Sequence, residues 1–469
     1  YQVIGAFGHG WDDLETYTNQ FVTVAKNKTN ASREVIVSNM VDFFEDFEAT
    51  FGTSLPSVSA SFGNEWELYG VSMAEVSARV KRTVEKLRGA EALATLVSHK
   101  DPSFMNGRQA ARDQAWMNLG LYWEHDWTAD SPRFSPSDRA NWQRELATGI
   151  ENYINTLHDD AASSLAGMIK KSGSNLRFYA FNPLSWTRTD IADLPYSNSS
   201  AVHIVDLSTG QETPSQLVNI NGQQYLRVLA QNVPPVGYKV FEVRSVASQS
   251  FPGGPSVNAL SGVIENDMYR VTVAKWGAIT SLLDKTRGNR QFAKGIGGYH
   301  LNDLGSSTGV LAVENAGPVS ATLRATAAGP LAHTARITLI RESGRIDIHN
   351  QITQNFNSTH TWRYGFNLDS PDVWHEEVGA VIRAKLLADG GHYSPRNARY
   401  DWLTLNHFAD ISGNGGVGVT LSNADCYFMK LGNSTLETLD VNTPQISPLV
   451  GSTRTAAGLG VLMLLRCLP

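Results

Sequence analysis

The sequence predicts a multidomain α+β protein, with part of an α/β domain first, then three packed helices, then large antiparallel β-sandwich domains. Two observations support this order. Between residues 72 and 171 apolar residues recur at helical spacing. After Gly173 the period changes to strand-like alternation, interrupted by Gly, Pro and Asn. The 469 residues leave room for about two to four domains.

Residues 1–70 have the alternating texture of an α/β unit. Tyr1–Gly8 is typical of a buried strand ending in a Gly-rich turn, Val35–Val37 predicts a second short strand, and Met40–Thr50 predicts a helix. Two strands cannot bury both faces of a parallel sheet. We therefore expect residues 1–70 to be the C-terminal part of an α/β domain whose remainder lies upstream.

Residues 71–172 predict three long amphipathic helices joined by short connections, which is the pattern of a three-helix bundle. The second helix is expected from Arg108 to Trp123. The apolar stripe of the first helix is formed by Val76, Val80, Val84 and Leu87.

The third helix has a clear start signal, with Ser135 as N-cap, Pro136 at the first position and Asp138 three residues after the cap. Gly173 is the expected C-cap, after two lysines that suit the helix dipole. Its apolar stripe is formed by Trp142, Leu146, Ile150, Tyr153 and Leu157.

The β region divides into a small domain at 173–250 and a large sandwich at 251–469, with Ser248–Pro255 as a candidate linker. Alternation is clear in five runs: Arg177–Phe181, Gln224–Leu229, Tyr269–Val273, Ile337–Ile340 and Gly418–Leu421. From Gly451 onward alternation is lost, and an apolar run ends the chain. A C-terminally incomplete domain or a frameshift would explain this, and a buried last strand is the alternative.

Composition excludes several classes of protein. The net charge of -6, with 18% charged residues and no basic stripe, argues against nucleic acid as a partner. No apolar run reaches the roughly 18 residues that span a bilayer. Two cysteines exclude a disulfide scaffold and Cys-rich metal sites. We expect a cytoplasmic rather than a secreted protein, and a homo-oligomer remains open. The 11 Trp and many small polar residues suit neutral ligands such as carbohydrates.

The first candidate site is the turn Gly8–Asp13, directly after the first predicted strand. In α/β folds such turns line the ligand crevice. Asp12 and Asp13 could serve as acid and base, because neighbouring carboxylates push their pKa values apart. The alternative is that one of them caps a helix beginning near Leu14, which the spacing slightly favours. The two roles are compatible.

The second candidate site is Glu124-His125-Asp126, within an aromatic run that includes Tyr122, Trp123 and Trp127. A neutral imidazole is a common zinc ligand, and a carboxylate can bind a pair of sugar hydroxyls. Aromatic faces stack on sugars. The alternative is a histidine at a helix C-terminus, favoured by the dipole, followed by a solvated aspartate. No second ligand stands at His-x-Asp or His-x-x-x-His spacing nearby.

A third cluster, Trp374-His375-Glu376-Glu377, places a histidine beside two carboxylates. Neighbours in a strand point to opposite faces, so we interpret it as a strand or loop with a solvated acidic edge. His392, His407 and Asp410 receive the same structural interpretation. Cys426 is expected to be a small core residue.

Five stretches together resemble one family. They are Gly63–Tyr69, Glu124–Trp127, Ala180–Trp186, Glu265–Tyr269 and Arg399–Phe408. Through them the chain, to about residue 450, resembles the bacterial α-mannosidases of glycoside hydrolase family 38. The resemblance implies a barrel-like α/β domain, a three-helix bundle and C-terminal β domains.

The resemblance also implies retaining exo-glycosidase chemistry with one zinc ion and an α-mannoside as substrate. His125 then looks like a zinc ligand and Asp126 like the residue that holds sugar hydroxyls. Asp13 looks like the acid/base residue, with Asp12 as its alternative. Trp123 and Tyr299 are the further expected sugar contacts.

The family's His-x-Asp pair and nucleophilic Asp would lie upstream of Tyr1. Retaining chemistry needs two carboxylates, and zinc needs three or four ligands. We therefore expect a fragment with little or no mannosidase activity and no bound zinc. Two alternatives stay open. One is a non-catalytic carbohydrate-binding or structural module. The other is a hydrolase of altered specificity with a site rebuilt from Asp12, Asp13, His125, Asp126 and the His375 cluster.

Overall fold

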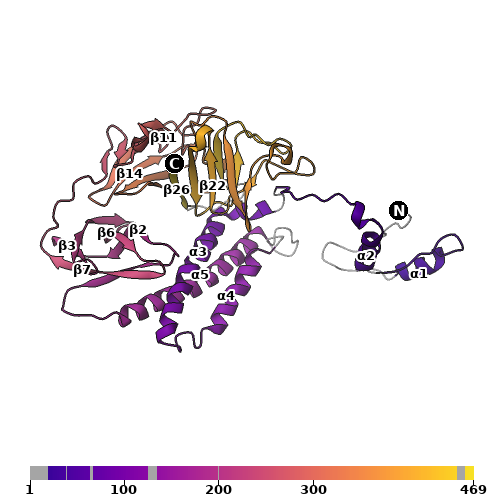
Figure 1. Cartoon of the computed structure of the whole chain (residues 1–469), viewed down its shortest axis with the longest axis horizontal. Coiled ribbons are helices and arrows are strands. Elements are labelled where there is room, and N and C mark those ends of the chain that lie inside the picture. Colours follow the sequence, from indigo (N-terminus) through magenta and orange to yellow (C-terminus); the bar gives the residue numbers. More distant parts are fainter. Residues whose placement is uncertain are drawn as a thin grey trace. The chain divides into compact units, whose positions relative to one another are not determined.

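The computed structural model describes residues 20–38, 40–63, 67–124, 135–198, 200–451 and 460–468. The chain divides into two compact units, residues 1–59 and 60–469. The described residues contain five α-helices and many antiparallel strands (Figure 1), which confirms the predicted mixed fold class. The domain limits expected from the sequence stay predictions.

The first unit contains helices α1 (Gln20–Lys28) and α2 (Met40–Phe51). The predicted helix after residue 40 is therefore confirmed. The strand predicted at Val35–Val37 is wrong, because these residues pair with no described strand and Ile36 is 72% exposed. Three apolar residues in a row do not form a strand without a neighbour to pair with. The strand predicted at Tyr1–Gly8 lies outside the described residues.

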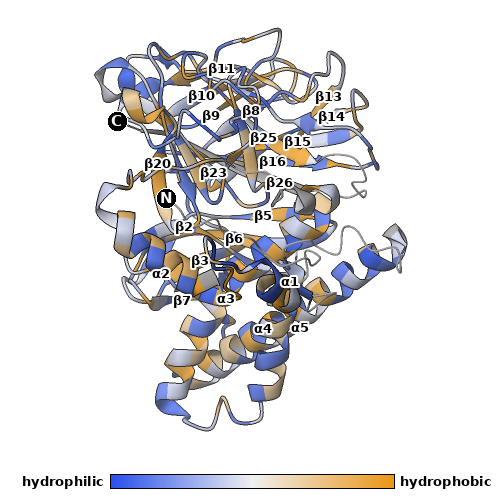
Figure 2. Cartoon of the chain, turned by 90° about the vertical axis from the view of Figure 1, so that its right-hand side faces the viewer, coloured by the Kyte–Doolittle hydropathy of each residue, from blue (hydrophilic) through white to orange (hydrophobic). Residues whose placement is uncertain are grey.

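The second unit begins with three helices that lie side by side in Figure 1: α3 (Ala74–Lys100), α4 (Gln109–Tyr122) and α5 (Pro136–Met168). Helix α5 packs against both α3 and α4. Each helix carries hydrophilic and hydrophobic residues along its length (Figure 2), as amphipathic helices should. The predicted stripes are confirmed, since their members lie buried or half-buried in the shared core.

The two ends of α5 show one correct and one wrong prediction. Ser135 and Asp138 form the expected capping box, with Asp138 N–H donating to Ser135 Oγ at 3.2 Å and Ser135 N–H donating to Asp138 Oδ2 at 3.1 Å. Gly173 is not the C-cap. The helix ends at Met168 because Ile169 turns to an extended conformation and packs against the helix core. Gly173, at φ +83°, instead lies in the loop that leads to the first strand.

Two small sheets follow the helices. One has the order β1-β7-β3-β4 and the other β2-β6-β5. Their strands are β1 (Arg177–Asn182), β2 (Arg188–Pro195), β3 (Val202–Asp206), β4 (Gln211–Thr213), β5 (Ser215–Ile220), β6 (Gln223–Val233) and β7 (Gly237–Ser245). Side chains from both sheets, among them Leu226 and Phe241, share one apolar core. We call this part, residues 177–245, the small β region.

The large β region spans residues 256–468 and is built on a nine-stranded sheet of order β13-β14-β15-β16-β26-β23-β22-β19-β20. These strands are β13 (Val310–Ala316), β14 (Ser320–Ala327), β15 (His333–Ile340), β16 (Arg345–Ile352), β19 (Asp372–Glu377), β20 (Ala380–Arg383), β22 (Phe408–Ser412), β23 (Gly418–Asn423) and β26 (Gly460–Leu468). All five alternating runs of the sequence lie in strands, as predicted.

Two five-stranded sheets share the apolar core of this large sheet. The first consists of β8 (Ser256–Asn258), β9 (Val263–Glu265), β10 (Tyr269–Val273), β11 (Ile279–Asp284) and β12 (Arg290–Gln291). The second consists of β17 (His360–Thr361), β18 (Tyr364–Gly365), β21 (Leu403–Thr404), β24 (Phe428–Leu431) and β25 (Gln445–Gly451).

Strand β26 corrects the interpretation of the last segment. It pairs antiparallel with β16 on one side and β23 on the other, in the middle of the nine-stranded sheet. A short continuous apolar run is consistent with a strand of this kind. The last segment therefore forms a strand, as one of the two alternatives predicted.

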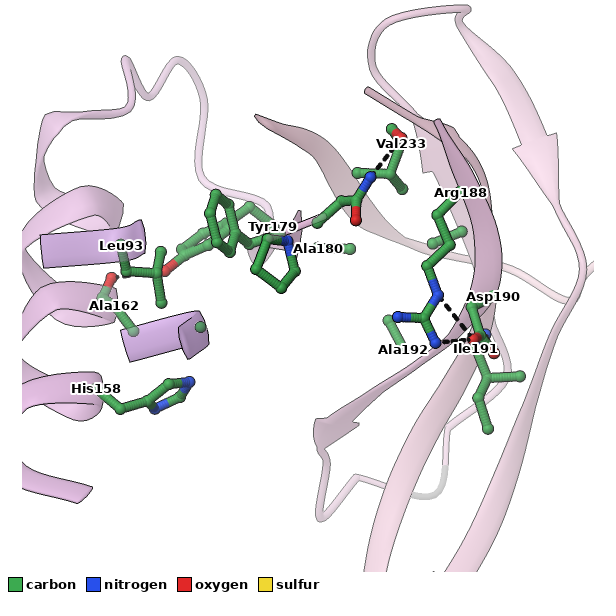
Figure 3. A pocket seen from close by; sticks show the side chains of 15 residues that line it. Leu93, His158, Ala162, Tyr179, Ala180, Arg188, Asp190, Ile191, Ala192 and Val233 are labelled. Atoms are coloured by element: carbon green, nitrogen blue, oxygen red, sulfur yellow. Dashed lines mark hydrogen bonds and ion pairs between the residues drawn. The ribbon is translucent and has the colours of Figure 1, made fainter. Parts of the chain in front are cut away.

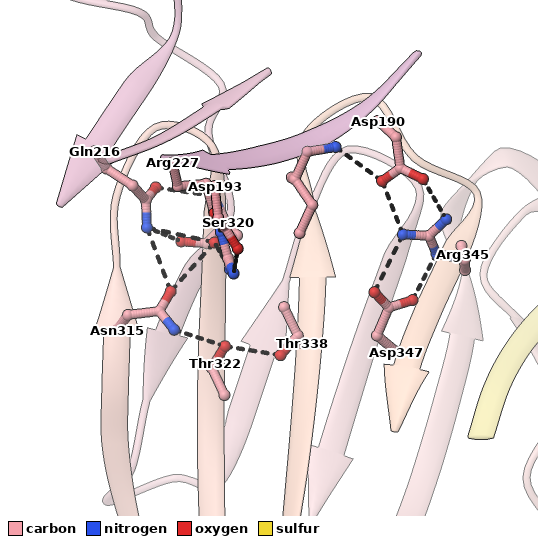
Figure 4. Close-up of polar contacts among 11 residues, drawn as sticks. Asp190, Asp193, Gln216, Arg227, Asn315, Ser320, Thr322, Thr338, Arg345 and Asp347 are labelled. Atoms are coloured by element: carbon pink, nitrogen blue, oxygen red, sulfur yellow. Dashed lines mark hydrogen bonds and ion pairs between the residues drawn. The ribbon is translucent and has the colours of Figure 1, made fainter. Parts of the chain in front are cut away.

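Charged side chains join the small β region to the large one (Figure 4). Arg345 of β16 donates to both oxygens of Asp190 on β2, at 2.8 and 2.9 Å, and to Asp347 at 2.6 and 3.2 Å. Burial alone would raise the pKa of Asp190, but the bonds from Arg345 outweigh it and lower that pKa. Nearby, Arg227 donates to both oxygens of Asp193 at 2.8 Å.

Replacing Arg345 by Met should destabilise the junction by about 3 kcal/mol, because two half-buried carboxylates lose their shared partner. Urea unfolding followed by circular dichroism measures this. Arg324→Met is the matched control, since Arg324 is more exposed and its partner Glu314 keeps Arg336. Equal stability of the two variants would contradict a structural role for Arg345.

Candidate functional site

Four residues of the predicted site, Asp12, Asp13, His125 and Asp126, lie outside the described residues. Trp123 and Tyr299 are described. The structure therefore describes the Glu124-His125-Asp126 tripeptide only up to Glu124, and the surroundings of Trp123 are formed by α3, α4 and Tyr427, just before β24.

Trp123 ends α4, with its N–H donating to Leu119 O at 3.2 Å. Its ring packs edge to face against Tyr122 at 4.9 Å and against Tyr427 at 5.0 Å between centroids. The side chain is fixed by these contacts and still 41% exposed, which leaves an aromatic surface for a ligand.

Tyr122 has a structural role. It is fully buried, so it does not reach a sugar as its place in the aromatic run suggested. Ser77 Oγ donates to Gly70 O at 2.7 Å, which leaves the Tyr122 hydroxyl to donate to Ser77 Oγ at 2.9 Å. Burial raises the pKa of Tyr122, so this hydroxyl keeps its proton and the bond.

Lys81 of α3 fastens the helices to the large β region. Only 4% of it is exposed. Its Nζ donates to Asn406 O and, at 2.6 Å, to Cys426 O, and it lies 4.7 Å from the centroid of the Tyr427 ring. Burial lowers the pKa of Lys81 to about 8, against the attraction of nearby acids. The same Tyr427 ring touches Trp123, so Lys81 supports the Trp123 surface indirectly.

His407 makes a second link across this interface. Its Nδ1 lies 2.9 Å from both oxygens of Glu376, and its Nε2 lies 2.9 Å from Glu85 Oε1 on α3. The predicted solvated acidic edge is therefore wrong. Glu376 is half-buried against His407, and Glu377 accepts bonds from Ser61 Oγ at 3.2 Å and Tyr393 at 3.1 Å. These carboxylates face partners from distant segments that no local pattern could indicate.

His375 lies in a strand, as predicted, but is fully buried. Its Nδ1 contacts Thr404 O at 2.7 Å and its Nε2 the Tyr393 hydroxyl at 3.2 Å. Burial lowers the pKa of His375 to about 4. A neutral imidazole enclosed in this way cannot contact a substrate. Cys426 is likewise buried, which confirms it as a core residue, and burial raises its pKa to about 12.

Tyr299 lies in a turn closed by Ile296 and is half-buried. The Arg363 guanidinium carbon lies 3.5 Å from the centroid of its ring. One face of the ring is thus covered by a cation, and only the rest of the ring is open to a sugar.

The described residues contain no group of three or more His, Cys, Asp or Glu side chains that could hold a metal ion. They do not fit a zinc ion, which needs three or four such ligands. No helix in the described part of the chain is long and apolar enough to cross a membrane.

The lowered pKa of Lys81 predicts an unusual pH dependence. Between pH 8 and its ordinary value of 10.5 the unfolded chain binds a proton that the folded chain does not, so the contribution of Lys81 to stability rises with pH. The unfolding free energy of the wild type minus that of Lys81→Met should rise by up to about 3 kcal/mol over this window. Urea titrations of both proteins measure it. A constant or falling difference would contradict the buried cation.

The lowered pKa of His375 predicts a loss of stability at acid pH. Between its ordinary value of 6.5 and about 4 only the unfolded chain takes up a proton, so stability falls as the pH falls. The His375→Gln side chain can keep one donor and one acceptor but cannot titrate. Between pH 7 and pH 4 its free energy of unfolding should therefore fall less than that of the wild type, by up to about 3 kcal/mol at pH 4. Thermal melts of both proteins from pH 7 to pH 4 test this. Parallel acid profiles would show that His375 is accessible to protons in the fold.

No family model and no curated protein matches the sequence. Solved structures do. An α-mannosidase from Enterococcus faecalis V583 is 13% identical, with a TM-score of 0.70 over 96% of this chain and 62% of that chain. A glycosyl hydrolase family 38 protein from Enterococcus faecalis is 15% identical, with a TM-score of 0.66 over 94% of this chain and 61% of that chain. This chain thus spans less than two thirds of either protein, and it has the fold of the family 38 α-mannosidases.

Proposed function

We propose that this chain forms the helical and β-sandwich part of a retaining α-mannoside hydrolase, and that the end of α4 is one wall of its sugar site. The observation that carries the proposal is Trp123. Its indole is fixed between Tyr122 and Tyr427, keeps 41% of its surface exposed, and leads directly into Glu124-His125-Asp126. The fold shared with an α-mannosidase over 96% of the chain supports the assignment.

In this proposal the chain's own residues bind and protonate the substrate. Trp123 would stack on the sugar, Asp126 would accept bonds from its hydroxyls, and Tyr299 would contact it from the β region. Asp13, or its neighbour Asp12, would give a proton to the leaving oxygen and later take one from water. A retaining reaction also needs a nucleophilic carboxylate, and we assign that role to none of the described residues.

Zinc enters the proposal only through His125. His125 is the ligand that this chain would add, and a zinc ion there would hold sugar hydroxyls and spread negative charge. Because the described residues contain no further ligand group, we assign no zinc-dependent step to this chain. We expect the purified chain to bind no zinc.

A non-catalytic carbohydrate-binding module is the second candidate. The open indole of Trp123, held between two aromatic rings, favours it. The rebuilt hydrolase site is not proposed with the His375 cluster, since His375 is fully buried and hydrogen-bonded on both ring nitrogens.

Sugar binding at Trp123 is measured by saturation-transfer NMR with methyl α-mannoside and methyl α-galactoside. We expect transfer to the mannoside above that to the galactoside, and a loss of at least about fivefold in affinity in Trp123→Ala, because stacking contributes about 1 kcal/mol. Trp116→Ala is the matched control, an indole on the same helix that is 52% exposed. Equal losses in the two variants would argue against a site at the end of α4.

Catalysis is measured with p-nitrophenyl α-mannoside. The purified chain should not hydrolyse it, with or without added zinc, because a retaining reaction needs a second carboxylate. Hydrolysis that is lost in Asp13→Asn and on chelation would overturn this expectation and assign a complete site to the chain.

A further inference from the structure

A cavity of about 440 Å³ lies between the helices and the small β region. Figure 3 shows its walls, with Leu93, His158 and Ala162 from α3 and α5 on one side and Arg188 to Ala192 of β2 on the other. Its volume falls in the range of small-molecule sites, roughly 300–1,000 Å³. None of its lining residues belongs to the surroundings of Trp123.

The walls combine an apolar lining with aromatic rings. Tyr179 and Phe181 of β1 line the cavity and are half-buried, beside small residues such as Ala192 and Ala230. The Tyr179 hydroxyl donates to Ala162 O at 2.8 Å, which leaves its oxygen able to accept a hydrogen bond. An aromatic wall with a hydroxyl acceptor suits the apolar face and edge hydroxyls of a sugar ring.

Two nitrogen atoms without a partner among the described residues lie on opposite sides of the cavity, one on Arg188 and one on His158. Arg188 uses Nε and Nη2 on Asp190, and its Nη1 makes no bond to any described residue. His158 uses Nδ1 on Asp159 at 2.9 Å, and no described residue contacts its Nε2. Their side chains are 41% and 35% exposed, so solvent and small ligands can reach both.

The two oppositely charged side chains that line the cavity, Arg188 and Asp190, pair with each other. Asp190 also binds Arg345, which does not line the cavity. An anion would therefore gain little from the site, because Arg188 already has a carboxylate partner. What remains is the capacity to bond a neutral, hydroxyl-rich molecule.

We propose that this cavity is a second carbohydrate site, which binds a neutral sugar of one or two rings between Tyr179, Arg188 and His158. The sugar ring lies against Tyr179 and Phe181, Arg188 Nη1 donates to one hydroxyl, and His158 Nε2 bonds another. The site is separate from the wall at Trp123 and does not depend on the proposed hydrolase function.

The experiment uses the full chain with labelled methyl groups, titrated with methyl α-mannopyranoside and methyl α-glucopyranoside. Methyl signals of Leu93, Ile191 and Ala192 report on the cavity alone. We expect saturable shifts at millimolar sugar, weakened about fivefold in both Arg188→Met and His158→Leu, each of which removes one bond. Arg88→Met and His99→Leu, on exposed parts of α3, are the matched controls and should bind as the wild type does.

Ala162→Leu fills the cavity and should abolish the shifts while the melting temperature stays the same or rises. If that variant unfolds, the Arg188 and His158 variants decide the question. Three results would overturn the proposal: no saturable shift of these methyl groups, unchanged binding in both polar variants, or mannose 6-phosphate binding more tightly than the mannoside. The methyl reporters lie in the cavity, so they follow binding there and not binding at Trp123. A failure of the proposed site at Trp123 can therefore be told apart from a failure of this one.

Discussion

The arrangement of helices and β region depends on one buried charge. Lys81 of α3 places its ammonium group where two backbone carbonyls, Asn406 O and Cys426 O, and the ring of Tyr427 converge. An unpaired buried cation would be costly, so these groups must stay in place as long as Lys81 is buried. Tyr427 in turn packs on Trp123. The position of the aromatic end of α4 thus follows from a contact made two turns along another helix.

Polar contacts of this kind join the parts of the chain, whereas each part has its own apolar core. The helices, the small β region and the large β region bury largely separate hydrophobic clusters. Between them lie Arg345 with Asp190, Arg227 with Ser320, and His407 with Glu85 and Glu376. Directional bonds fix one relative orientation, since a charged group displaced from its partner loses both the bond and the compensation for burial. The cavity between the helices and the small β region lies next to these contacts, since Asp190, a partner of Arg345, lines it.

The sequence was informative where structure depends on near neighbours and uninformative where it depends on distant ones. The capping box of Ser135, the stripes of α3 and α5 and the alternating strands are set within a few residues, and all were predictable. The wrong predictions rest on local patterns that are not enough by themselves. Val35–Val37 pairs with no described strand. Ile169 ends α5 by packing on the core before Gly173 is reached. Lys81 and its acceptors stand 325 and 345 residues apart, and His407 stands 322 from Glu85, so no spacing rule could pair them. Of the candidate site, the sequence indicated Trp123 but not the Tyr427 and Lys81 that support it.

The central claim is that the rigid, half-exposed indole at the end of α4 faces a sugar. A crystal structure of the chain with methyl α-mannopyranoside bound tests this most directly. The account predicts a sugar ring against Trp123, with Tyr122 and Tyr427 in the positions described here. A sugar found only away from Trp123, or an indole that leaves Tyr427 when the sugar binds, would contradict it.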